Sequence, residues 1–262
     1  MFERNSFWGH FEELRKRIIK IICVVFGLSV FFFIFDIRTA NLYGITLIYP
    51  YPDVFRTIST RVFLKISNDL LPSTVKLVAL TPWDAMLIQF QVSIILGVIF
   101  GFPVIVHQFT KFIAPALYKH EKRILLKLII PSTLLFILGC IFAYILIIPF
   151  SILFLYQFAG AMDIEQMFTV DEFISFVLLF ILAFGILFQL PVIMVGLSSL
   201  GIASPDFWLR KWKVAFFVSL LFAAIITPDG TGITMLMIAF PMLGLYFIGY
   251  GFAKRNRFLK IF

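Results

Sequence analysis

The stretch ILLKLIIPSTLLFILGCIFAYILIIPFSILFL, residues 124–155, contains a single charged side chain, that of Lys127. A helix rises about 1.5 Å per residue, so this stretch exceeds the roughly 20 residues that cross the hydrocarbon core of a bilayer. Five other apolar stretches lie around it, and the predicted spans are residues 18–35, 85–106, 124–155, 173–201, 214–227 and 233–253. The sequence therefore predicts an all-α integral membrane protein with six transmembrane helices in one polytopic domain, residues 1–262.

The basic residues between these spans lie mainly on one side of the membrane that the spans imply. Residues 1–20 hold five Lys and Arg, residues 107–127 hold five, residues 208–213 hold three and residues 254–260 hold four, which makes 17 of 22. The other five lie in the predicted external loop, residues 36–84. Because positively charged segments stay on the cytoplasmic side, we expect a multi-pass protein of the cell membrane with both termini in the cytoplasm.

Composition excludes a water-soluble domain. The chain is 61% hydrophobic and 14% charged and contains 35 Phe, far from the balance of soluble domains. The predicted inner side holds 17 basic and five acidic residues, and the outer side holds five basic and nine acidic residues. Together they give the net charge of +8. That division indicates membrane topology and attraction to anionic lipids, not nucleic-acid binding. The charged lead before the first span predicts no cleavable signal sequence.

Prolines and glycines shape the predicted spans. Prolines inside a span remove a backbone donor and bend the helix, which is compatible with a filled bundle and also favours kinked helices that form a curved, concave wall. These prolines are Pro103, Pro131, Pro149, Pro191 and Pro241. Gly97 and Gly101 have the GxxxG spacing that permits close helix contact. The fifth span has only about 14 apolar residues, or roughly 21 Å, and is short for an unperturbed bilayer.

The predicted external loop has structure of its own. Apolar side chains recur every four residues at Val54, Ile58, Val62, Ile66 and Leu70. That period predicts an amphipathic helix that lies at the outer surface or caps the bundle. The prolines of residues 49–52 predict an extended segment before it.

The predicted membrane core holds few residues that could carry chemistry. Its mid-span polar groups are Gln89, Gln91 and Gln189, and we expect Gln189 either to face the concave wall or to bond to a neighbouring helix. Ion-coupled carriers need intramembrane carboxylates or a coordinating cage, and enzymes need convergent titratable groups. We therefore expect no catalytic residue, metal or cofactor and no enzyme activity. A small-solute carrier or channel is the alternative, and a membrane-embedded enzyme is a more distant one.

Acidic residues inside two basic segments are the candidate binding residues. Glu12 and Glu13 lie in HFEELRKR, residues 10–17, and Glu121 lies in FIAPALYKHEKR, residues 112–123. These glutamates either neutralise the basic side chains around them or accept guanidinium groups from a ligand. A carboxylate can bind arginine through two parallel hydrogen bonds, which lysine cannot form.

The same two segments resemble the TatC family, the polytopic core subunit of the twin-arginine protein translocase. The family pattern His-x-x-Glu-Leu-Arg-x-Arg matches at residues 10–17, and Phe-x-x-Pro-x-Leu-Tyr-x-x-Glu matches at residues 112–121. Further matches lie in the third and fourth spans, in the turn at residues 227–229 and at residues 241–246. The resemblance extends over essentially the whole chain, with Gln189 at a position where the family often has Glu.

The resemblance implies a receptor for folded proteins whose signal peptides carry paired arginines. It implies that the cytoplasmic glutamates Glu13 and Glu121 bind the arginine pair and that Phe112, His10 and Arg17 belong to the same signal-peptide-binding patch. Transport in the family is driven by the proton-motive force, with no cofactor or nucleotide site on this subunit.

The resemblance also implies partners within the membrane. The family's fifth and sixth helices are short and dock single-span TatA and TatB subunits, which places partner docking at Ala224, Ile225 and Met235 of this chain. A homo-oligomer within the complex is expected as well.

Overall fold

A computed structural model describes residues 2–42, 45–71, 75–161, 167–227 and 232–259, without the side chains of residues 2–10, 40–42, 45–48, 76, 116, 120, 158–159 and 256–259. The predicted turn at residues 227–229 therefore lies largely outside the described residues. The chain forms two compact units, of which the first comprises residues 1–108 and 152–178 and the second comprises residues 109–151 and 179–262. Each unit is described by itself below. The single polytopic domain, residues 1–262, stays a prediction.

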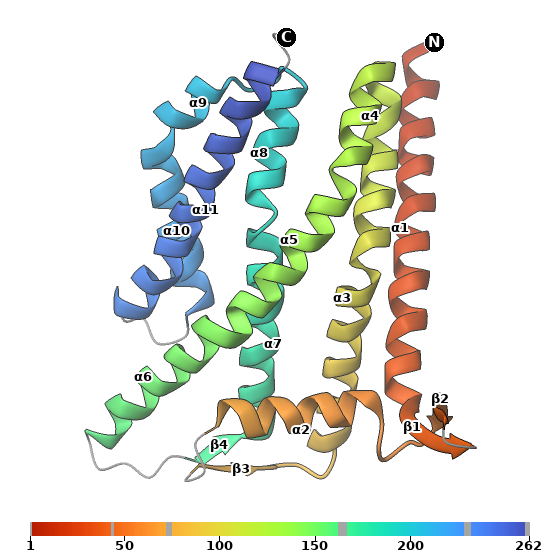
Figure 1. The fold of residues 1–262 in the computed structure, drawn as a ribbon, viewed down its shortest axis with the longest axis vertical. Helices are drawn as coiled ribbons and strands as arrows, with labels where there is room; N and C mark the ends of the chain where they lie inside the picture. The colour runs from red at the N-terminus through yellow and green to blue at the C-terminus, as the bar shows by residue number, and fades with distance from the viewer. Residues whose placement is uncertain (1, 43–44, 72–74, 162–166, 228–231, 260–262) are drawn as a thin grey trace. The chain divides into compact units, whose positions relative to one another are not determined.

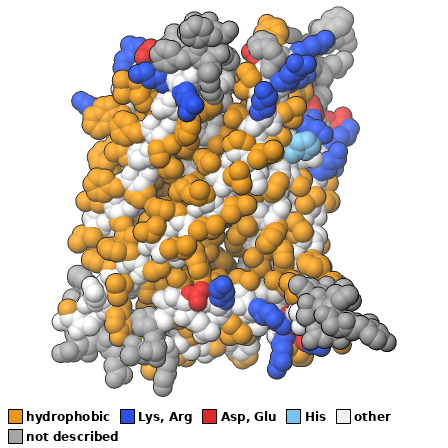
Figure 2. All heavy atoms as spheres, viewed as in Figure 1, with side chains coloured by type: hydrophobic (Ala, Val, Ile, Leu, Met, Phe, Trp, Pro, Cys, Tyr) orange, Lys and Arg blue, Asp and Glu red, His pale blue; other side chains and the backbone are white. Residues whose placement is uncertain are grey.

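Helices that are long and apolar enough to cross a membrane occur where the sequence predicts them. Within the described residues these are Phe11–Ile34, Asp84–Ile113, Glu121–Gln157, Val170–Ser199 and Gly232–Arg255, with a shorter apolar helix at Trp212–Ile226. On the face shown in Figure 2, charged side chains gather at helix ends and hydrophobic side chains cover the stretches between them. The six predicted spans are confirmed as apolar helical segments.

The first unit is built on two helices that lie side by side, α1 (Phe2–Ile34) and α3 (Asp84–Ile113) (Figure 1). The predicted lead and first span thus form one continuous helix. A Cβ atom added to Gly97 would clash with the side chain of Ser29 and lie 2.8 Å from the carbonyl oxygen of Val25, both on α1. One added to Gly101 would lie 3.3 Å from Val25. The predicted GxxxG contact is confirmed, because only glycine lets the two backbones approach this closely.

Replacing Gly97 by alanine is therefore expected to destabilise the protein. The added methyl group meets a backbone oxygen that cannot rotate away, and overpacking of this kind costs about 1–3 kcal/mol. A Cβ atom at Gly27, on the exposed side of α1, would have no other atom within 4 Å, so Gly27→Ala is the matched control. Thermal unfolding in detergent should show a lower midpoint for Gly97→Ala only; equal midpoints for the two variants would contradict the close contact.

A β-hairpin that the sequence did not predict follows α1. β1 (Phe35–Leu42) pairs antiparallel with β2 (Ile45–Pro52), with Phe35 opposite Pro52. The predicted extended segment, residues 49–52, is the second half of β2. We call the end of the first unit that carries the hairpin the hairpin end. The amphipathic helix is confirmed as α2 (Ile58–Leu70), which runs roughly perpendicular to α3 at this end and buries Ile66 and Leu70 (Figure 1).

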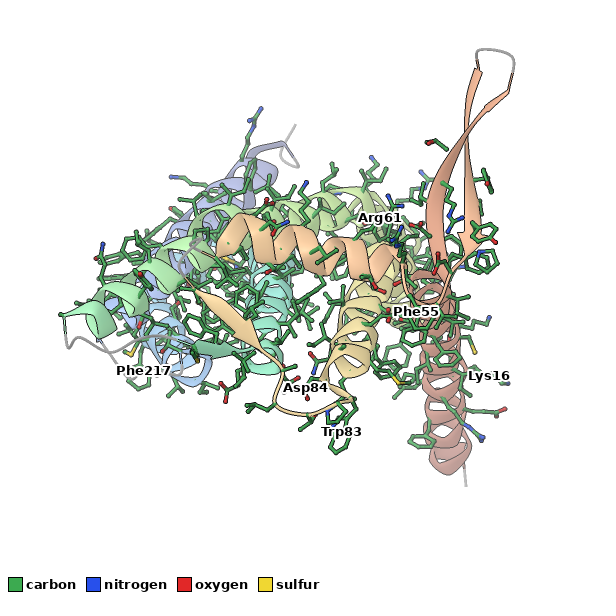
Figure 3. The ribbon with its side chains drawn as sticks, turned by 90° about the horizontal axis from the view of Figure 1, so that it is seen from below. Lys16, Phe55, Arg61, Trp83, Asp84 and Phe217 are labelled. Atoms are coloured by element: carbon green, nitrogen blue, oxygen red, sulfur yellow. The ribbon has the colours of Figure 1, made fainter. Side chains whose placement is uncertain are left out.

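An ionic cluster joins the hairpin to α2. The side chain of Asp36 on β1 is only 2% exposed, and its two oxygens accept hydrogen bonds from Arg61 on α2 at 2.7 and 2.9 Å. Arg38 donates to Asp53 at 2.7 Å and so links β1 to the end of β2. Figure 3 shows Arg61 at the end of α2 nearest the hairpin. A carboxylate buried this deeply is stable only with such partners.

The rest of the first unit also packs at the hairpin end. It contains the residues of α6 (Ile148–Gly160) from Ile152 onward and those of α7 (Val170–Leu187) up to Leu178. Between these helices, β4 (Met167–Thr169) pairs in parallel with β3 (Lys76–Val78), so the chain before α3 and the chain before α7 run together.

The glutamines of α3 lie at this end as well, which corrects their predicted mid-span position. Gln89 donates to the carbonyl oxygen of Phe33 and to Oγ1 of Thr57, each at 3.1 Å. Gln91 donates to the carboxylate of Asp171 at 2.9 Å. Both side chains therefore join helix termini, where polar partners gather, because α3 begins only at Asp84.

The long third span, which belongs to the second unit up to Ser151, is divided at its prolines. It forms α4 (Lys119–Lys127), α5 (Ile129–Phe142), the π-helical turn η2 (Ala143–Ile147) and then α6. Pro131 follows the first break and Pro149 follows the π-helical turn, since neither can donate a hydrogen bond to the turn before it. Pro191 likewise lies at the start of α8 (Leu190–Ser199) after a break in the fourth span. Pro103 and Pro241 lie inside uninterrupted helices.

The last helices differ in length. α9 (Pro205–Arg210) and α10 (Trp212–Ile226) lead to α11 (Gly232–Leu259). α10 has 15 residues, or about 22 Å, which confirms the short fifth span. α11 has 28 residues, so the expectation of a short sixth helix is wrong. The helix continues past its apolar part into the basic segment that follows.

The core of the second unit lies where α5 meets the second half of α7. Phe136 on α5 and Phe184 on α7 are fully buried, with 0% of each exposed. Gly139 of α5 lies against Phe184 and Phe188. Gly185 of α7 lies against Phe136 of α5. Gln189 lies next to this contact, in the break between α7 and α8.

Candidate functional site

The carboxylate of Glu13 is held by a basic side chain of its own helix. Nε of Arg17 donates to Oε1 of Glu13 at 3.2 Å, and Nη2 contacts the same oxygen. The exposed fractions are 31% for Glu13 and 19% for Arg17. The neighbouring pair, Glu12 and Lys16, is joined at 2.9 Å, with about two-thirds of each side chain exposed (66% and 68%). Arg17 thus positions the carboxylate of Glu13, while the Glu12 pair is a solvated surface pair.

Glu121 caps the helix that it begins. The chain leaves α3 after Phe112, passes through the 3-10 turn η1 (Ala114–Ala116) and reaches Tyr118, the residue before α4. Oε2 of Glu121 accepts a hydrogen bond from the backbone N–H of Tyr118 at 2.9 Å. An acid in the first helical turn satisfies a backbone donor there and is favoured by the helix dipole. Sequence reasoning missed this role, although the helix start after Tyr118 could have indicated it.

Each glutamate uses only one carboxylate oxygen in these bonds. Oε1 of Glu13 takes both contacts from Arg17, and Oε2 of Glu121 takes the bond from Tyr118. Within the described part of the chain, the other oxygen of each accepts no hydrogen bond, and no ion pair joins Glu121 to the basic residues of α4. A carboxylate has about four acceptor sites, so each glutamate can accept a further donor.

Glu13 lies at one end of the first unit. α1 and α3 run antiparallel, because Val25 lies against Gly101 while Phe33 packs on Phe90 with ring centres 6.3 Å apart. Glu13 therefore lies at the end of this pair opposite the hairpin, where α3 reaches residue 108. The segment that leads to Glu121 leaves the first unit at that same end, and Glu121 itself belongs to the second unit.

Aromatic side chains flank Glu121 along the chain. Phe112 is half-buried in the last turn of α3, whereas Phe109 and Tyr118 are 63% and 75% exposed. The exposed rings offer apolar surface close in sequence to the carboxylate. His10 lies in α1, but its side chain is outside the described residues.

Gln189 forms a polar contact inside the second unit. Oγ of Ser132 on α5 donates to Oε1 of Gln189, and Nε2 of Gln189 donates to the carbonyl oxygen of Ser132 at 3.1 Å. Nε2 also lies 3.4 Å from the carbonyl oxygen of Gly185. Of the two alternatives predicted, the structure has the bond to a neighbouring helix. Sequence reasoning did not identify Ser132, because one serine beside a proline carries no sign of a partner 57 residues away.

Replacing Gln189 by leucine should weaken this helix contact. Interhelical hydrogen bonds in membrane proteins contribute about 0.6–2 kcal/mol, so we expect a lower unfolding midpoint and weaker export or assembly. Ser132→Ala should have a similar effect, and the double variant should lose less than the sum of the two because they share one contact. The signal-peptide binding that the resemblance to the TatC family implies should remain. If Gln189→Leu abolished peptide binding as fully as a Glu121 variant, these roles would not be separate.

The predicted partner-docking residues lie on consecutive helices of the second unit. Ala224 and Ile225 lie in the last turn of α10 and are exposed, Ile225 by 77%, whereas Met235 is half-buried in α11. Ile225 ends an exposed apolar row on α10 at helical spacing, formed by Val214, Phe217, Val218, Leu221 and Ile225. α10 therefore presents an apolar face of the kind that lipid or another helix covers.

The long apolar helices, with charged residues gathered at their ends, define a polytopic α-helical membrane protein. Residues 9–241 match the model of the family described as TatC, Sec-independent protein translocase protein. The chain belongs to the TatC family. It is therefore a multi-pass membrane subunit of the twin-arginine translocase, a transport system and not an enzyme.

Relatives of known identity agree over almost the whole chain. The Sec-independent protein translocase protein TatC of Cenarchaeum symbiosum is 36% identical over 251 residues, which are 96% of this chain and 95% of the relative. TatC of Aquifex aeolicus is 32% identical over 247 residues, 94% of this chain and 93% of the relative.

Solved structures agree as well. Two crystal structures of the twin-arginine translocase receptor TatC, the second in DDM, match at 32% identity with TM-scores of 0.74 and 0.76. They cover 94% and 93% of this chain, and the matches extend over 98% and 99% of those chains. The predicted resemblance is confirmed. These matches support a translocase subunit and not the alternative, a small-solute carrier or channel.

Proposed function

We propose that this chain is the receptor and core subunit that binds the twin-arginine signal peptides of folded proteins and nucleates the translocon for their export. Binding takes place at the cytoplasmic end of the helices, which is the end of Glu13. The similar crystal structures bear the name of a receptor, which supports the proposal.

This proposal rests on the carboxylates of Glu13 and Glu121, each of which uses only one oxygen in the hydrogen bonds described above. Both glutamates lie among lysines and arginines, which repel a basic peptide unless a carboxylate is available to it. Each has one oxygen already fixed by Arg17 or Tyr118, so its orientation is set before a ligand arrives. The remaining oxygens suit guanidinium groups, because charge-assisted hydrogen bonds of this kind are roughly twice as strong as neutral ones.

Cross-linking tests the proposal directly. A signal peptide with a photoreactive residue beside its arginine pair is added to the purified protein in detergent, and a twin-lysine peptide serves as the control. We expect the twin-arginine peptide to label residues 10–17 or 112–123 and the twin-lysine peptide to label them much less, because lysine keeps the charge but loses the fork geometry. Equal labelling by both peptides would refute an arginine receptor.

The exposed row on α10 is the proposed docking surface for single-span TatA and TatB subunits. These subunits would cover Ile225 and the apolar side chains before it, with Ala224 and Met235 at the margin. The assembled complex also contains further copies of this chain, and the proton-motive force drives transport.

The orientation of the helices gives a separate prediction. If both termini are cytoplasmic, Asn68 on α2 faces the outside and Lys119 at the start of α4 faces the inside; both side chains are exposed. In a variant without Cys23 and Cys140, cysteine at Asn68 should react with a membrane-impermeant thiol reagent in intact cells. Cysteine at Lys119 should react only after the membrane is opened. Labelling of Lys119→Cys alone in intact cells would reverse the topology.

A further inference from the structure

An apolar groove runs between α1 and α3 in the first unit. It has a volume of about 650 Å³ and is lined from α1 by Ile22, Phe26 and Val30 and from α3 by Phe90, Ile94 and Val98, among others. The two serines in its wall turn their hydroxyl groups away, since Ser29 donates to Val25 at 2.8 Å and Ser93 donates to Gln89 at 2.6 Å, each within its own helix. The groove therefore presents only apolar surface.

The groove is open toward the outside of the helix pair. Ile22 and Phe26 are 58% and 64% exposed, and Phe90 is 50% exposed, although all three lie within predicted spans. Side chains at this depth face hydrocarbon, so the natural content of the groove is apolar. Gly97 lies beside the groove, because it allows α1 and α3 to approach at Ser29, and Ser29 and Val98 line the groove.

We propose that this groove binds one acyl chain of an anionic phospholipid whose phosphate lies at Arg15. The lining of the groove extends along α1 from Ile21 to Phe33. Twelve helical steps cover about 18 Å, so the groove begins near the inner end of the predicted span and reaches past the roughly 15 Å depth of one leaflet, which gives an acyl chain room along its length. A transmembrane helix about 30 Å long and 10 Å across occupies on the order of 2,400 Å³, so only its side chains could enter. An acyl chain is thin enough to lie in the groove along its length.

The charge at one end of the groove agrees with an anionic headgroup. Arg15, Ile18, Ile22 and Phe26 follow one another at three- and four-residue steps, so they share one face of α1. Arg15 is exposed. Glu12 pairs with Lys16 and Glu13 pairs with Arg17, so among the described residues neither glutamate forms an ion pair with Arg15. A phosphate placed at Arg15 lies one to two turns beyond the start of the groove, where the headgroup of a lipid with its chain in the groove belongs.

Lipid retention by variants of the groove tests where the acyl chain binds. The purified protein is mixed with phosphatidylglycerol or phosphatidylcholine of the same acyl chains, and the lipids retained are counted by native mass spectrometry. Val98→Phe places a ring in the groove and should reduce the retention of both lipids several-fold. Ile95→Phe places the same ring on α3 at a position that does not line the groove and should leave retention unchanged. Equal retention in both variants would overturn the proposal.

A second pair of variants tests the headgroup. Arg15→Gln should remove a preference for phosphatidylglycerol of about fivefold, the effect of one basic residue near a lipid surface. Lys20→Gln removes the same charge from the opposite face of α1 and should keep the preference. If Lys20→Gln had the same effect as Arg15→Gln, general surface charge would explain binding and the site would be refuted. A disulfide from cysteine at Val98 to another protein chain in native membranes would also refute it, since a partner helix would then occupy the groove.

Discussion

Glu121→Gln is expected to lower the affinity for a twin-arginine signal peptide by about 10- to 150-fold. A charge-assisted hydrogen bond lost at such a site costs about 1.5–3 kcal/mol. Glutamine keeps an oxygen that can accept the backbone N–H of Tyr118, so the cap of α4 remains while the negative charge is lost. The variant therefore separates recognition from folding. Titration of a fluorescent peptide at fixed salt measures the effect.

Two controls accompany this variant. Glu12→Gln removes the same charge from an exposed pair with Lys16 and should change affinity little, because that pair is solvated on both sides. Glu121→Ala removes both charge and cap, so it should bind as poorly as Glu121→Gln and also lose about 0.5–2 kcal/mol of stability. If Glu121→Gln bound the peptide like the wild type while Glu121→Ala did not, Glu121 would act only as a helix cap.

Gly139→Ala is expected to have the largest effect on stability. A Cβ atom there would lie 2.5 Å from the carbonyl oxygen of Phe184 and 2.9 Å from the side chain of Phe188. The first of these is backbone and both residues are buried, so α5 and α7 must move apart in the centre of the second unit. We expect a cost at or above the upper end of the 1–3 kcal/mol typical of overpacking, seen as a lower unfolding midpoint and reduced yield.

Gly244→Ala is the matched control for this variant. Gly244 lies in α11 of the same unit, and a Cβ atom there would meet no other atom within 4 Å. Alanine also favours helix over glycine by about 0.5–1 kcal/mol, so the control should be neutral or stabilising. A Gly139→Ala midpoint at or above that of Gly244→Ala would show that the two helices do not pack as described.

The helices could be predicted because their signals are local. Apolar length identified the spans, the four-residue period identified α2, and three of the five prolines marked breaks. The hairpin could not be predicted in this way. An isolated two-stranded hairpin is only marginally stable, and this one is held by Asp36 to Arg61 and Arg38 to Asp53, contacts between residues 25 and 15 positions apart.

The candidate site was predictable only in part, for a similar reason. The residue types and spacing indicated Glu13 and Glu121, but the partners that orient them depend on structure. The cap by Glu121 requires a helix start at Lys119, and the bond from Gln189 to Ser132 requires the crossing of α5 with the break after α7. A polar residue on an apolar helix shows that a partner is needed, whereas only the fold shows which one.

We propose that Glu13 and Glu121 both bind the arginine pair of the signal peptide. A double-mutant cycle of peptide affinity, with Glu13→Gln, Glu121→Gln and both together, tests it most directly. Each single variant should weaken binding by about 10- to 150-fold. The double variant should lose less than the product of the two factors, because removal of either glutamate already loosens the arginine pair from the other. Wild-type affinity in both single variants, with unchanged unfolding midpoints, would show that these glutamates do not bind the arginine pair.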